Sequence, residues 1–166
     1  MTLDEILPGT RVFIDSTIFV YHFTEASLEC RRLLERCQRK DIDAVSSVVV
    51  VAEVAHRLMM IEALRLGLVR GANIPKKLRA RPDAVRGLRL YQEAIDRIPH
   101  MGVDVVDLDL ATMLRSRDVR SRYGLLVNDS LVVASAQAKS AAALASADGD
   151  FERVDGLKLF RPADLL

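Results

Sequence analysis

Short apolar runs alternate with stretches of helical periodicity along the chain. Residues 11–14 predict a short buried strand, and further strands are expected at 42–45, 103–108, 143–147 and 157–160. Helical segments separate these runs, which allows the strands to lie parallel in βαβ units. The pattern therefore predicts an α/β fold with one parallel sheet flanked by helices.

The helical segments show apolar residues at intervals of three and four positions. The run 45–51 is ambiguous, because its valines also favour a strand. Ser46 or Ser47 is a good N-cap, so we place a helix from Ser47 to about Leu66. Other helices are expected after Thr24-Glu25, over 82–98, from a cap at Asp109 to about 122, and from about 127 to 139.

Length and composition suit one domain covering residues 1–166. The formal net charge is +1, so global charge does not indicate a polyanion partner. No apolar run approaches the ~20 residues that span a membrane, and the first residues lack a signal-peptide pattern. We expect a cytoplasmic protein without membrane contact. Cys30 and Cys37 are ~10 Å apart on one helix, too far for a disulfide, and are expected to be buried thiols.

A basic segment interrupts this pattern. Between positions 65 and 89 the chain has eight basic residues and only one acidic residue, Asp83. We call residues 67–82 the basic connector. It offers phosphate contacts for RNA, and it could equally be a solvated loop or a protein-binding face. The candidate RNA-binding residues are Lys76, Lys77, Arg79 and Arg81.

Acidic residues occur where the predicted elements begin or end. Asp15 follows the first strand, Glu53 lies in a helix with an apolar start, Asp129 opens a helix, and Asp148 and Asp150 follow the strand at 143–147. Burying a lone charge is costly. Several carboxylates converging on one point suit a hard cation such as Mg²⁺ or Mn²⁺.

Each acid also has a structural explanation. Asp129 could be a helix N-cap, Asp148 and Asp150 could be turn residues, and Glu53 could pair with Arg57 on a helix surface. Asp15 is the hardest to explain structurally. The order and spacing of the acids are more specific than any one of them.

Four segments together resemble the PIN domain family, and within it the VapC-like toxins of prokaryotic type II toxin–antitoxin pairs. They are 13–21 around Asp15, 45–54 around Glu53, 127–136 around Asp129, and 144–151 around Asp148. The resemblance covers nearly the whole chain and implies a sheet of order 3-2-1-4-5. The segment at about 67–82 makes this chain longer than compact members of the family.

The resemblance also implies a Mg²⁺-dependent endoribonuclease toxin with an RNA substrate, a cognate antitoxin and a homodimeric assembly. Its catalytic residues would be Asp15, Glu53, Asp129 and Asp148. Asp15, Asp129, Asp148 and Asp150 would bind the metal, and Ser16, Asn128 and Ser146 would orient those ligands.

Two other functions fit parts of the pattern. One is a PIN-fold scaffold that binds RNA or protein without cleaving it. The other is a receiver-like phosphoacceptor domain, which needs paired acids at the end of its first strand, where this chain has only Asp15. His22 and His100 are expected to be surface residues rather than catalysts.

Overall fold

Five short strands form one parallel sheet in the computed structural model, which describes residues 1–165. They are β1 (Arg11–Ile14), β2 (Asp43–Ser47), β3 (Val103–Val106), β4 (Ala143–Ala145) and β5 (Lys158–Phe160). Their order is β3-β2-β1-β4-β5. The predicted α/β class and the order 3-2-1-4-5 are confirmed.

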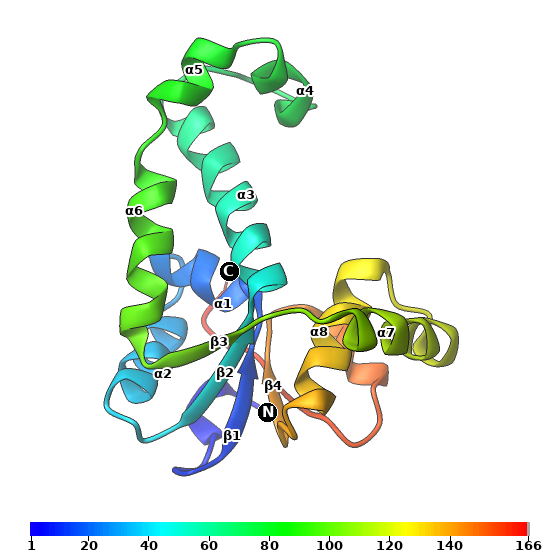
Figure 1. The fold of residues 1–166 in the computed structure, drawn as a ribbon. Coiled ribbons are helices and arrows are strands. Elements are labelled where there is room, and N and C mark those ends of the chain that lie inside the picture. Colours follow the sequence, from blue (N-terminus) through cyan, green and yellow to red (C-terminus); the bar gives the residue numbers. More distant parts are fainter. Residues whose placement is uncertain (166) are drawn as a thin grey trace.

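Helices cover both faces of the sheet (Figure 1). Helices α1 (Ser16–Phe23) and α2 (Leu28–Gln38) lie on one side, and α7 (Leu110–Tyr123) and α8 (Val127–Ala138) lie on the other. Three 3₁₀ turns, Leu3–Glu5, Ile98–Met101 and Gly149–Arg153, complete these layers. The core lies between the layers and is built on fully buried side chains such as Phe13, Phe19 and Leu144.

Strand β2 ends later than expected, at Ser47 rather than at residue 45. The reason is that Ser46 and Ser47 still pair with Val105 and Val106 of β3, whereas the pairing with β1 ends at Val45. The Ser46 hydroxyl in addition donates to the carbonyl of Ile14 on β1 (2.9 Å). Ser47 then caps α3 (Val48–Arg65) by accepting from the N–H of Val50. The predicted cap is confirmed, and the valine run forms the first turns of a helix.

A helical arm rises from the carboxyl ends of the strands (Figure 1). It consists of the second half of α3, helix α6 (Leu90–Arg97), and the segment between them with α4 (Ile74–Arg79) and α5 (Pro82–Gly87). The basic connector lies at the far end of this arm. The arm has a small apolar core of its own, separate from that of the sheet, around Ala63, Val69, Leu78 and Leu88.

The expected single helix over 82–98 is wrong, because α5 and α6 are separate helices. Glu62, on α3, is 5% exposed. Its carboxylate accepts from the N–H groups of Arg89 (2.8 Å), Leu90 (3.1 Å) and Tyr91 (3.0 Å). An acid from another helix thus caps α6 and fixes its start.

The cysteines and one of the histidines lie inside the fold. Cys30 and Cys37 are buried free thiols, as predicted, and burial raises their pKa values to about 11 and about 12. His100 is exposed, as expected. His22 is not a simple surface residue, because both of its ring nitrogens are shielded from solvent and lack a hydrogen-bond partner within residues 1–165.

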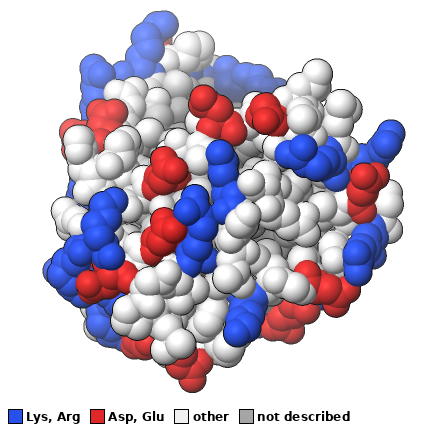
Figure 2. Space-filling view, turned by 60° about the horizontal axis from the view of Figure 1, so that its bottom comes forward, with Lys and Arg blue, Asp and Glu red and all other residues white. Residues whose placement is uncertain are grey.

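The end of the molecule opposite the arm has a mixed charge. Figure 2 brings this end forward and shows basic and acidic residues interspersed over it. Its charges are therefore balanced locally, unlike those of the basic connector. No helix within residues 1–165 combines the length and the apolar character that a membrane crossing requires.

Candidate active site

The predicted site residues lie where the central strands end and three helices begin. Asp15 follows β1 and Asp148 follows the neighbouring strand β4 by three residues. Glu53 lies in the second turn of α3, and Asp129 lies in the first turn of α8. Open parallel sheets bind ligands at this edge, outside the carboxyl ends of the strands.

Asp15 is fixed by hydrogen bonds to one of its two oxygens. It is 4% exposed and is the N-cap of α1. Its Oδ2 accepts from the N–H of Thr17 (3.3 Å), the hydroxyl of Thr17 (2.8 Å) and the hydroxyl of Ser146 (2.7 Å). Oδ1 receives none of these bonds, so it remains available to a ligand.

Two hydroxyls join the ends of β1 and β4. Thr17 donates to Asp15 and accepts from the N–H of Ala147 (2.9 Å). Ser146 also donates to Asp15 and accepts from the N–H of Asp148 (3.1 Å). The contact of Ser146 with Asp15 agrees with its predicted orienting role. Thr17 was missed, although a hydroxyl two residues after a capping Asp is a signal for such a turn.

The other two predicted orienting residues do not contact the acids. The Ser16 hydroxyl accepts from Nη1 of Arg57 (3.4 Å). Asn128 is exposed, and its side chain makes no hydrogen bond within the described chain, residues 1–165. Their predicted role in orienting a ligand therefore stays a prediction.

The electrostatics of Asp129 show that the acids converge. The pKa of Asp129 is raised to about 6, mainly by burial and then by the negative charges of Asp148, Asp15, Glu53 and Asp150, in decreasing order. Leu126 occupies the N-cap position of α8 and Asp129 is the third residue of the helix, so the N-cap explanation of Asp129 is wrong. Half-buried carboxylates that repel one another carry a charge that favours a cation.

The remaining acids have local partners. Glu53 Oε1 lies 3.8 Å from Arg57 Nη1, and both side chains are about one-third exposed, at 30% and 34%. Asp148 accepts from the N–H of Asp150 (2.8 Å) and caps the following 3₁₀ turn, so its turn role is present as well. Asp150 is exposed and forms an ion pair with Arg153.

The donors of this acid cluster, Asp15, Glu53, Asp129, Asp148 and Asp150, fit a hard cation in their chemistry. All are carboxylates, the ligands that Mg²⁺ and Mn²⁺ prefer. Within residues 1–165, no three Asp, Glu, His or Cys side chains are arranged to share a metal ion as they stand. Asp129 is thus close enough to feel the charges of the other four acids, while the carboxylates of the described residues are not close enough to share one ion as they stand.

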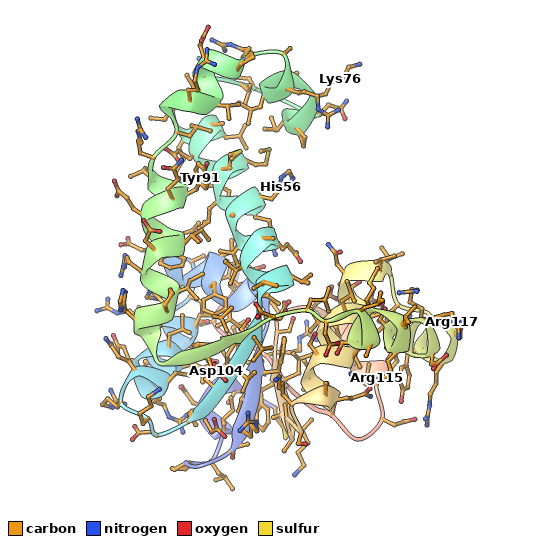
Figure 3. All side chains as sticks on the ribbon, in the orientation of Figure 1. His56, Lys76, Tyr91, Asp104, Arg115 and Arg117 are labelled. Atoms are coloured by element: carbon orange, nitrogen blue, oxygen red, sulfur yellow. The ribbon has the colours of Figure 1, made fainter. Side chains whose placement is uncertain are left out.

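The candidate RNA-binding residues lie at the far end of the arm and fall into two groups. Lys77 and Arg81 donate to the backbone carbonyls of Arg70 and Leu68, which folds the segment back on itself. Lys76 and Arg79 are exposed and have no such bond within the described residues. In the view of Figure 3, Lys76 and His56 lie on the side of the arm on which α7 and α8 also lie, with Lys76 at the far tip.

Residues 12–157 match the model of the PIN domain. The chain belongs to the PIN domain family. The strand order also separates this family member from receiver-like domains, whose order is 2-1-3-4-5.

Among curated proteins, Ribonuclease VapC2 of Methanocaldococcus jannaschii is 26% identical over 149 residues, which are 90% of this chain and 92% of the relative. Two solved structures share the fold of this PIN protein. VapC20 of Mycobacterium tuberculosis, described as a toxin that cleaves the Sarcin-Ricin loop, has a TM-score of 0.59 and 14% identity, covering 89% of this chain and 97% of its own. VapBC2 of Rickettsia felis, bound to a DNA fragment from its promoter, has a TM-score of 0.57 and 18% identity, covering 92% and 99%.

Proposed function

We propose that this PIN domain protein is a Mg²⁺-dependent endoribonuclease, with Mn²⁺ as an alternative metal, and the toxin of a type II toxin–antitoxin pair. The observation that carries the proposal is the convergence of half-buried acids on one edge of the sheet, seen in the raised pKa of Asp129. The names of the relatives support the reaction, since VapC2 is called a ribonuclease and VapC20 is described as a toxin that cleaves the Sarcin-Ricin loop.

The cation would be held by Asp15, Asp129 and Asp148, with Asp150 able to join if it leaves Arg153. When bound, such a cation activates water and neutralises charge at phosphorus. The chain itself would keep Oδ2 of Asp15 fixed through Thr17 and Ser146, leaving Oδ1 for the metal. Glu53 would orient the attacking water.

The partners follow from the same proposal. The structure from Rickettsia felis is of VapBC2, and another neighbour is a toxin–antitoxin complex from Klebsiella pneumoniae, with a TM-score of 0.56 and 18% identity. These complexes support a cognate antitoxin for this chain. We propose in addition a homodimer that acts in the cytoplasm on RNA.

A cleavage assay tests the proposal. Purified protein is incubated with structured RNA in Mg²⁺, in Mn²⁺ and in EDTA, and the products are resolved on a gel. We expect cleavage with either metal and none in EDTA. RNA that stays intact in both metals while it binds the protein would favour the non-catalytic scaffold instead.

A further inference from the structure

Arg57 lies at the Glu53 side of the acid cluster, away from the Arg153–Asp150 ion pair in sequence. Arg57 follows Glu53 by one helical turn on α3, and its Nη1 is 3.8 Å from Glu53 Oε1 and 3.4 Å from Ser16 Oγ. Ser16 comes directly after Asp15, the buried N-cap of α1. The guanidinium therefore spans from α3 to the start of α1, where it contacts the residue that follows Asp15.

Both contacts of Arg57 are loose. Charge-assisted hydrogen bonds between guanidinium and carboxylate are normally ~2.7–2.9 Å long. On α2, the pair Arg31–Glu35 has the same spacing of four residues and a contact of 2.9 Å. Arg57 is thus less firmly paired than a surface arginine of this chain.

The guanidinium retains donors for a ligand. It carries five N–H groups, and within residues 1–165 only Nη1 has a polar contact. The side chain is 34% exposed, so a molecule entering the acid cluster can reach it. An arginine that only balanced the charge of Glu53 would be expected to form two parallel hydrogen bonds to that carboxylate.

A phosphodiester entering this cluster carries a negative charge into a group of carboxylates. A cation beside them offsets that repulsion, and a guanidinium matches the oxygens of phosphate with two parallel donors. We infer that Arg57 is a substrate-binding residue whose guanidinium binds the RNA phosphate that enters the acid cluster. This inference rests on the proposed function. It adds to the site a basic residue, which is not among the predicted acids.

Three variants test the assignment. Arg57→Gln removes the charge, and Arg57→Lys keeps the charge without the fork. Arg31→Gln is the matched control, because it breaks an Arg–Glu pair of the same spacing away from the acid cluster. Each protein is assayed for melting temperature, for binding of a fluorescent RNA in EDTA over a salt series, and for cleavage with Mn²⁺.

We expect Arg57→Gln to bind RNA more weakly and to lower the slope of log affinity against log salt by ~0.7–0.9, the value for one phosphate contact. Its kcat/KM should fall by ~10²–10³, as when one donor to a reacting oxyanion is removed. Arg57→Lys should restore the salt slope and only part of the cleavage. Arg31→Gln should match the wild type.

Contrary results are distinct. If Arg57→Gln lowers the melting temperature but binds RNA with the wild-type salt slope, Arg57 only balances Glu53 and the assignment is overturned. Equal cleavage by wild type and Arg57→Gln overturns it as well. If the wild type fails to cleave, the proposed nuclease function fails, and the salt slopes alone still decide whether Arg57 contacts phosphate.

Discussion

Replacing Asp129 by Asn should stabilise the metal-free protein at neutral pH. The pKa of Asp129 rises from 3.8 to about 6, first through burial and then through the neighbouring acids. A tenfold change in an acid constant corresponds to ~1.4 kcal/mol, which gives an upper limit of ~3 kcal/mol. Because the side chain is only partly buried, solvent screening reduces this to ~1–2 kcal/mol.

The sign follows from proton linkage. The folded protein binds the Asp129 proton more tightly than the unfolded chain does, so the linked stability is complete below about pH 3.8 and is lost as pH rises through about 6. At pH 7.5 in EDTA the Asn variant should therefore melt ~2–8 °C above the wild type, since ~1 kcal/mol corresponds to ~2–4 °C in a domain of this size. At pH 4 the difference should vanish.

Added Mg²⁺ should reverse the ranking. At ~100 times Kd, binding adds ~2.7 kcal/mol to the wild type, or ~5–10 °C, and the Asn variant should gain clearly less. Thermal melts at both pH values, in EDTA and in Mg²⁺, give the difference in melting temperature between the Asn variant and the wild type under each of the four conditions. Asp118→Asn, which removes an exposed carboxylate of α7, is the control and should leave each melting temperature unchanged. Equal Mg²⁺ shifts in wild type and Asp129→Asn would refute the reasoning.

Three further predictions concern other parts of the molecule. Asp15→Asn should keep the fold and lose RNA cleavage in Mn²⁺, because Asn can still accept the capping bonds but lacks the charge for a cation; an active, folded variant would remove Asp15 from the site. The double variant of Lys76 and Arg79 to Ala should lower the salt slope of RNA binding by ~1.4–1.8 without changing the melting temperature, whereas an unchanged slope would exclude phosphate contacts there. Glu62→Gln should lower the free energy of unfolding by ~1–3 kcal/mol in denaturant titrations, since an amide satisfies the three N–H groups less well; an unchanged midpoint would contradict the cap.

Local sequence signals were sufficient for the sheet and for the gathering of acids. Most strands contain a short apolar run, and the acids lie shortly after strands or in the first two turns of helices, where the parallel topology brings them to one edge of the sheet. Asp15 is the clearest case, because its position after β1 defines both its burial and its capping role.

Long-range contacts could not be predicted in the same way. The break between α5 and α6 depends on Glu62, more than 20 residues earlier in the chain. Ser146, the partner of Asp15 directly after β4, was found from its motif, while Thr17 required knowledge of the turn geometry. The position of Arg57 beside Ser16 depends on the packing of α3 against α1, which no local pattern encodes.

The buried carboxylate of Glu62 makes the outer arm an exchangeable module. Its hydrogen bonds join α3 to the first turn of α6. In the outer part of the arm, beyond these bonds, the residues around Ala63, Val69, Leu78 and Leu88 pack on one another rather than on the sheet. Segments of different length could thus be grafted between residues 67 and 87 while the joint and the acid cluster below it keep their geometry. Such a graft point would let a PIN domain change what the arm reaches without changing the acid cluster.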